Sequence, residues 1–215
     1  MIRPKKQTSR RDTLDIAAKA HSSGKIKKAI TEYLKILRVD PGDYDIHARL
    51  APLLAKSNRP EEAWGSFRAA ADGYCARGFL DKSQSIYTLA CRTLPQKAEA
   101  WEEAIKLQVE RGLKADAVQT AVESCKHLKS HINRKKATVL LRKVYMLVPW
   151  HPELTLCLAR NEAKEKRKKE ALWLYEGIAE RCKGQLKRSA RLSAFWLSPG
   201  LGTLGRALKA TLLAR

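Results

Sequence analysis

The chain has 215 residues, of which 44% are hydrophobic, and it contains 11 glycines and 8 prolines. This composition excludes a largely disordered chain and favours a globular, mostly helical protein with one core or one continuous stack of repeats. The formal net charge of +21 is the unusual number.

The positive charge is concentrated at the two ends of the chain. Residues 1–40 hold 11 Lys or Arg and 4 Asp or Glu, residues 41–125 hold 11 and 12, and residues 126–215 hold 21 and 6. This asymmetry indicates an acidic partner for the C-terminal half: an anionic membrane surface, nucleic acid or an acidic protein. A solvated basic face that only keeps the protein soluble is an equally good interpretation.

The cysteines and the N-terminus indicate the compartment. The five cysteines are odd in number and form no Cys-x-x-Cys pair, which predicts free thiols in a reducing compartment. Asp12 and Asp15 follow the basic N-terminus and interrupt any apolar run there, so we expect no secretory signal. No run in the sequence approaches the roughly 18 apolar residues of a membrane span. We expect a cytoplasmic protein. A peripheral position at the inner membrane surface is an alternative that stays open.

The first predicted helical hairpin follows a basic N-terminal arm of residues 1–9. Gly24 predicts a reversal of the chain because glycine tolerates positive φ, and Pro41 predicts the end of the second helix. The apolar and small positions of this hairpin are Ile16, Ala17, Ala20, Ala29, Tyr33 and Ile36.

A second hairpin is predicted between Tyr44 and Arg77. Asn58 followed by Pro60 indicates a helix start, with a capping side chain and a proline in the first turn. The apolar positions here are Leu50, Ala51, Leu54, Ala63, Phe67 and Ala70.

The segment from Trp64 to Lys97 carries the clearest pattern. Its bulky residues are Phe67, Tyr74 and Tyr87, its small ones are Ala71, Ser83 and Ala90, and Gly78 and Pro95 mark a turn and an end. Small residues at these positions let two helices approach closely while bulky residues fill the space between them. The spacing resembles the tetratricopeptide repeat, a helix–turn–helix unit of about 34 residues.

A longer period joins the hairpins. Pro41, Pro95 and Pro149 are 54 residues apart, so we predict a three-helix repeat in which adjacent hairpins share the helix around residues 61–77. Three further columns have the same period: Ala63, Ala117 and Ala171; Tyr33, Tyr87 and Leu141; Ala29, Ser83 and Ala137.

The remaining repeats are predicted to reach Lys183, so that hairpins cover residues 10–183. The loop at residues 131–133 lacks the turn glycine and is the hardest boundary to place. Packing positions in this part are Trp101, Ala104, Ile105, Ala121, Leu140, Val144, Leu154, Leu158, Ala159, Leu172, Tyr175 and Ile178.

Residues 184–215 form a basic segment that ends in an amphipathic stretch with Leu201, Leu204, Leu208 and Leu212 on one stripe. Two interpretations stay open: a cap over the last hairpin, which solenoid ends require, and an anchor at a membrane surface. The residues expected to carry either role are Lys187, Arg188, Arg191, Trp196, Arg206 and Lys209.

The tetratricopeptide resemblance implies an all-α, right-handed superhelical solenoid whose first helices line a concave groove. It further implies a protein–protein interaction scaffold or adaptor that binds a peptide segment or partner protein in that groove. Leu14, Ala18 and Pro52 replace the Lys and Asn that grip chaperone C-termini in one subset of the family, which argues against that partner. Groove-facing positions would carry Arg68, Asp72, Lys106, Val109, Lys126, Lys129, Leu156, Arg160 and Lys164.

Two other motifs give only weak support for cofactor binding or metal binding. The stretch from Gly200 to Gly205 spells a dinucleotide fingerprint, but it lacks a surrounding βαβ unit and a following acidic residue. His127 and His131 are one helical turn apart and could share a metal ion, but no Glu lies between them as in a zinc-protease helix, so a solvated pair is the better interpretation. We therefore expect no enzyme, cofactor, metal or small-molecule substrate.

The alternative function is polyanion binding through the basic C-terminal half. Nucleic acid would need exposed aromatic side chains near the cations for base stacking. Trp150 and Trp196 are the candidates, whereas Trp101 and Trp173 are expected to pack in the core.

Overall fold

The computed structural model describes residues 9–200 and 202–206, and these residues form helices with no strand among them. Most of the N-terminal arm, together with Leu201, Leu208, Lys209 and Leu212, lies outside the described residues. The helices are α1 (Arg10–Ser22), α2 (Ile26–Val39), α3 (Tyr44–Lys56), α4 (Pro60–Ala76), α5 (Leu80–Thr93), α6 (Ala98–Glu110), α7 (Lys114–His127), α8 (His131–Leu147), α9 (Pro152–Lys164), α10 (Lys168–Arg181) and α11 (Gly184–Leu197). The predicted all-α class is confirmed.

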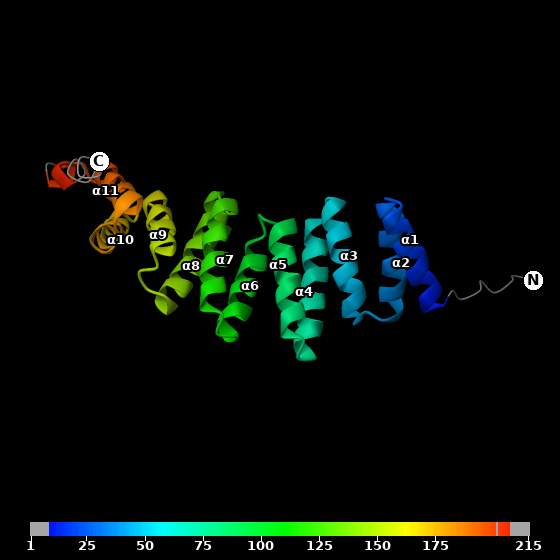
Figure 1. The fold of residues 1–215 in the computed structure, drawn as a ribbon. Helices are drawn as coiled ribbons and strands as arrows, with labels where there is room; N and C mark the ends of the chain where they lie inside the picture. The colour runs from blue at the N-terminus through cyan, green and yellow to red at the C-terminus, as the bar shows by residue number, and fades with distance from the viewer. Residues whose placement is uncertain (1–8, 201, 207–215) are drawn as a thin grey trace, which may run out of the picture. The chain divides into compact units, whose positions relative to one another are not determined.

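The described residues up to Pro95 form one compact unit, which contains α1 to α5 (Figure 1). Each helix of this unit packs against its neighbour in the chain, and α3 also contacts α5. Helical hairpins are therefore the building blocks of this unit, as the pattern predicted.

The second unit begins at Gln96 and contains α6 to α11. Consecutive helices again pack on one another, while α7 and α11 each contact α9, and α6 contacts α8. These contacts place α7, α9 and α11 in one layer of the unit and α6 and α8 in the other. The two layers decide which side chains of this unit share a surface.

The 54-residue period is visible in the backbone. Helices α3, α6 and α9 begin at residues 44, 98 and 152, and helices α4, α7 and α10 begin at residues 60, 114 and 168. The turns between the paired helices contain Asn58, Gly112 and Lys166, whose φ values are +57°, +74° and +64°. The predicted three-helix repeat is thus confirmed down to the conformation of its turns.

The small residues that define the pattern are buried at helix contacts. Their role is close approach, because a larger side chain there would push two packed helices apart. Those with no exposed surface include Ala17, Ala29, Ala51, Ala63, Ala71, Ser83, Ala90, Ala117, Ala121, Ala137, Ala159 and Ala171. Phe67 is likewise fully buried, and Tyr74 and Tyr87 are 8% and 5% exposed.

The boundary that lacks a turn glycine is formed by a side-chain cap. Ser130 precedes α8, and its hydroxyl oxygen accepts a hydrogen bond from the backbone N–H of Asn133 at 3.2 Å. The Asn133 side-chain amide in turn donates to the carbonyl oxygen of Gln96 at 3.0 Å. A capped start replaces the left-handed turn here, so α8 begins at residue 131 although no glycine precedes it.

Candidate binding surfaces

The groove positions expected in the first unit lie one turn apart on α4. Arg68 and Asp72 are both exposed. The Asp72 carboxylate already accepts a hydrogen bond from the Tyr87 hydroxyl at 2.9 Å. Asp72 therefore also ties α4 to α5.

In the second unit, cations project from the layer formed by α7, α9 and α11. Arg160 and Lys164 are exposed on one stripe of α9, and Arg160 donates to the Ser189 hydroxyl of α11 at 3.5 Å. Lys126 is exposed on α7, and Lys129 follows the end of that helix. The structure therefore brings predicted cations from neighbouring helices onto one layer.

Lys126 forms an ion pair with an acidic neighbour on the same helix, which offsets its positive charge. Its ammonium group donates to the Glu123 carboxylate at 2.7 Å, and this contact holds the pKa of Glu123 below its ordinary value. The His127 imidazole lies 3.4 Å from the other Glu123 oxygen and stacks on the Trp101 ring, with 5.7 Å between ring centroids. Trp101 is only 4% exposed, so it packs as expected.

Three predicted groove positions have other surroundings. Leu156 is 7% exposed and belongs to the core. Lys106 and Val109 lie on α6, in the other layer, where they line a groove of about 280 Å³ against α8. These two side chains do not share a surface with Arg160.

Two of the five thiols, Cys125 on α7 and Cys157 on α9, face each other. Cys125 accepts a hydrogen bond from the Asn161 amide at 3.8 Å. Its contact with Cys157 lowers the pKa of the Cys157 thiol to about 7, and the Arg160 charge acts in the same direction. This lowered pKa distinguishes Cys157 from an ordinary thiol, and this residue lies three residues before Arg160 on α9.

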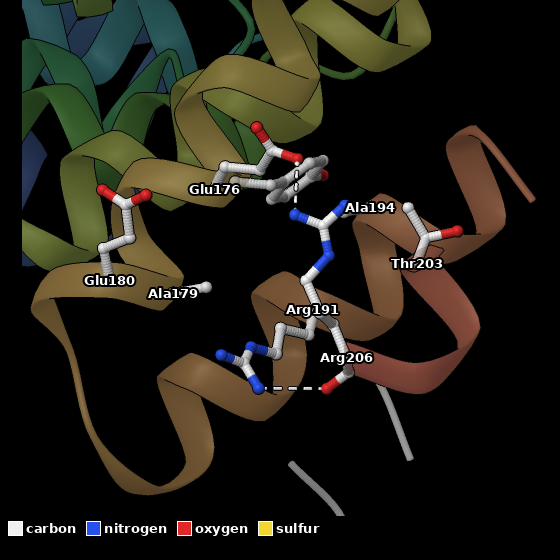
Figure 2. A pocket seen from close by; sticks show the side chains of 8 residues that line it. Glu176, Ala179, Glu180, Arg191, Ala194, Thr203 and Arg206 are labelled. Carbon is white, nitrogen blue, oxygen red and sulfur yellow. Dashed lines mark hydrogen bonds and ion pairs between the residues drawn. The ribbon is translucent and has the colours of Figure 1, made fainter. Parts of the chain in front are cut away.

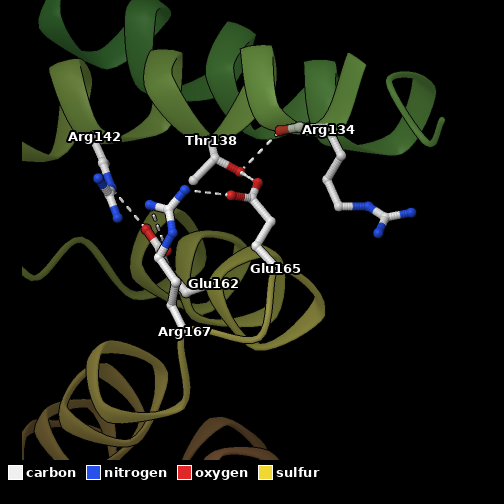
Figure 3. A network of polar contacts seen from close by, with 6 residues as sticks. All are labelled: Arg134, Thr138, Arg142, Glu162, Glu165 and Arg167. Atoms are coloured by element: carbon white, nitrogen blue, oxygen red, sulfur yellow. Dashed lines mark hydrogen bonds and ion pairs between the residues drawn. The ribbon is translucent and has the colours of Figure 1, made fainter. Parts of the chain in front are cut away.

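A buried carboxylate fixes α8 against α9, as Figure 3 shows. Glu162 is 1% exposed, and its oxygens lie 2.7 Å from the Arg142 Nε and 3.3 Å from an Arg167 nitrogen. Glu165 accepts a hydrogen bond from the Thr138 hydroxyl at 2.6 Å and pairs with Arg167 at the same distance.

The described part of the C-terminal segment packs back on the repeats. Helix α11 contacts α9 and α10 and buries Ala190 and Ala194, which is the contact that a capping role requires. Trp196 points away from this contact and is 79% exposed. Lys187, Arg188 and Arg191 are half-buried on the same helix.

A small pocket of about 150 Å³ lies between α10, α11 and the helical turn of residues 202–206 (Figure 2). Arg206 lies 3.4 Å from the Glu176 carboxylate, and its carbonyl oxygen accepts a hydrogen bond from Arg191 at 3.0 Å. The Thr203 hydroxyl accepts from the Gly200 backbone N–H at 3.0 Å. Arg191 and Arg206, two of the predicted tail cations, thus make internal contacts.

The other tryptophans differ in exposure. Trp150 is half-buried with Arg181 4.0 Å from its ring centroid, whereas Trp173, expected in the core, is 57% exposed. None of the helices in the described part of the chain combines the length and apolar character that crossing a bilayer requires. That part also holds no group of three or more His, Cys, Asp or Glu placed to bind a metal ion.

No protein-family model matches the chain, and no curated protein does. Among solved structures, PilF of Pseudomonas aeruginosa is 16% identical over 95% of this chain and 89% of that chain, with a TM-score of 0.35. A TPR repeat-containing protein of Cytophaga hutchinsonii is 14% identical over 94% of this chain and 95% of that one, also at 0.35. MamA is 16% identical over 95% and 89%, with a TM-score of 0.33.

The geometry of the helices themselves supports a description of the fold. Small residues without exposed surface lie at the helix contacts, left-handed residues form the turns, and hairpins recur along both units. The described helices of this chain are tetratricopeptide-like hairpins.

Proposed function

We propose that this chain is a non-catalytic scaffold that binds a peptide segment or partner protein on the second unit. The binding surface would be the layer of α7, α9 and α11, defined by Lys126, Arg160 and Lys164. It corresponds to the groove that the tetratricopeptide resemblance implies. A cytoplasmic location goes with this proposal, and the five free thiols are consistent with it.

The observation that supports it most is the alignment of exposed cations on helices that touch. Arg160 and Lys164 are one turn apart on α9, and Arg160 reaches Ser189 on α11. Guanidinium and ammonium groups fixed on rigid helices can pair with carboxylates of a bound segment, and such charge-assisted hydrogen bonds are the stronger kind. A partner segment with spaced Asp or Glu residues fits this surface.

The test uses charge reversal in the full-length chain. The variant K126E/R160E/K164E should lose a protein partner that the wild-type chain captures from an extract of its source cells. The matched control K25E/K27E/K28E makes the same change in charge on exposed residues of the first unit, and it should keep that partner. Equal capture by both variants would contradict the proposed surface.

The second candidate is polyanion binding, by nucleic acid or an anionic membrane surface, and the charge of residues 126–215 favours it. Its signature is affinity for an oligonucleotide or for anionic vesicles that falls steeply as salt is added. A protein partner retained at high salt with no such affinity supports the scaffold.

A further inference from the structure

The outward side of α8 carries apolar side chains that no part of the described chain covers. Ile132, Val139 and Met146 are 71%, 52% and 80% exposed. They are spaced seven residues apart, so they fall close to one line along a helix that turns about 100° per residue. We call these three residues the α8 stripe. Its ends are separated by about 21 Å at a rise of 1.5 Å per residue.

Basic side chains flank this stripe on both sides. Lys135 and Arg142 lie along one edge, and Lys136 and Lys143 lie along the other, as the same helical geometry dictates. No Asp or Glu occurs between residues 124 and 152, so α8 itself contributes no carboxylate. An apolar line between two basic edges is one half of the pattern by which two helices recognise each other.

A groove beside the stripe adds an apolar pocket. It has a volume of about 420 Å³ and is lined by Tyr145, Leu158, Trp173 and Leu174, together with two cations, Arg142 and Lys169, and two carboxylates, Glu162 and Glu170. The 57% exposed Trp173 ring lies 5.0 Å from the ring of Trp150. The exposed indole is therefore held in place and can receive a bulky side chain.

Three of the carboxylates near this surface pair with cations, while the exposed Glu170 adds a negative charge next to Lys169 at the groove. Glu162, at the groove wall, is paired with Arg142 and Arg167. Glu99 and Glu102 of α6 pair with Lys136 and Lys143 at 2.7 and 3.1 Å. The latter pairs are exposed, and such pairs contribute only about 0–1 kcal/mol, so a partner carboxylate can replace them.

We propose that the α8 stripe and its groove bind an amphipathic helix of a partner protein whose apolar residues are flanked by Asp and Glu. Apolar residues at heptad spacing would cover the stripe, and one bulky residue would enter the groove against Trp173. The flanking carboxylates would meet Lys135, Lys169 and the other rim cations. This surface goes beyond the proposed function above, because it is centred on α8 and α10, takes only Leu158 and Glu162 from α9, and uses none of Lys126, Arg160 and Lys164.

The probe is a fluorescent synthetic helix of about three heptads, with Leu at the a and d positions and Glu at the e and g positions. The full-length chain should raise its anisotropy on titration. V139D/M146D and W173A should each weaken binding by about tenfold or more, as expected for residues at the centre of an interface. The matched controls V39D and W196A alter side chains that are 86% and 79% exposed elsewhere, and they should bind as the wild type does.

Reversing charges on the surface tests whether the bound helix must be acidic. K135E/K169E should weaken the Glu-flanked helix and strengthen an otherwise identical Lys-flanked helix. Circular dichroism of each variant checks that it is folded. Failure of the Glu-flanked helix to bind, or binding that V139D/M146D and W173A leave unchanged, would overturn the proposal. It would also be overturned if an oligonucleotide or a phosphatidylserine vesicle bound more tightly than the peptide through these same residues.

Discussion

At the scale of single residues, the turns between paired helices require a left-handed backbone. Gly24, Gly78 and Gly112 supply it with glycine, whereas Asn58 and Lys166 adopt φ values of +57° and +64° with a side chain present. Sequence analysis could identify the glycine turns because glycine has no Cβ to obstruct positive φ. The turn at Lys166 could be found only from the 54-residue period, since lysine has no preference for that conformation.

Lys166 is exposed and is strained by its backbone conformation. A non-glycine residue in the left-handed region destabilises the folded state by roughly 1–3 kcal/mol. Glycine removes this strain, but it also gives the unfolded chain more conformational entropy, which offsets part of the gain. Lys166→Gly should therefore raise the free energy of unfolding by about 0.5–1 kcal/mol, measured by denaturant titration. The control Lys135→Gly, inside α8, should lower it by a similar amount; a loss of stability for Lys166→Gly would show that the turn is unstrained.

At the scale of helices, the alternation of small and bulky residues was enough to predict the hairpins, because close helix packing imposes it. The column of residues 54, 108 and 162 shows the limit of that reasoning. Leu54, Gln108 and Glu162 are all buried, at 2%, 6% and 1% exposure. A buried carboxylate is tolerated at residue 162 because Arg142 and Arg167 both pair with it. Arg142 lies twenty residues earlier in the sequence, so the pattern of apolar positions could not reveal this pairing.

The Glu162 network leads to a prediction for the contact between α8 and α9. R142A/R167A leaves a buried carboxylate without its cations, and it should destabilise the protein by about 3 kcal/mol or more. Adding Glu162→Leu, the residue present in the same column at Leu54, should recover part of that loss, because the buried Glu162 charge is then gone while Glu165, whose side chain is 3% exposed, still lacks Arg167. Denaturant titrations of the double and triple variants measure both steps, and a triple variant no more stable than the double would contradict this account.

The groove positions could be predicted only in part, because the sequence does not show which helices share a layer. A helix shared between two hairpins fits the first-helix pattern and the second-helix pattern equally well, so α6, α7 and α9 were all assigned groove positions. Contacts of α7 with α9, and of α6 with α8, separate them into two layers. Arg160 and Lys126 therefore share a layer, while Lys106 and Val109 lie on the other. The α8 stripe was missed because sequence analysis considered only the packing positions of this helix, such as Leu140 and Val144, and not the apolar residues on its other side.

At the scale of the whole molecule, the sequence predicted the helical class but not the division at Pro95. The 54-residue period runs through Pro41, Pro95 and Pro149 without interruption, so no change of composition marks the boundary between the two units. Charge does change along the chain, and residues 126–215 carry 21 basic and 6 acidic residues.

This excess charge should make stability depend on salt. Like charges repel in the folded state, and salt at physiological strength screens separations beyond about 8 Å. Exposed ion pairs are weakened too, but each contributes little. Added sodium chloride should therefore raise the melting temperature at neutral pH, by about 3 °C for each 1 kcal/mol of repulsion removed.

A variant separates screening of this repulsion from binding of a particular anion. K129Q/K168Q/K183Q removes three exposed cations from the second unit. It should melt at a higher temperature than the wild type at low salt and gain less from added salt, because less repulsion remains to be screened. Sodium sulfate at an equal, low ionic strength should act like the chloride. A melting temperature that falls with salt would mean that the ion pairs outweigh the repulsion, and a much larger effect of sulfate would mean that an anion binds to the basic residues.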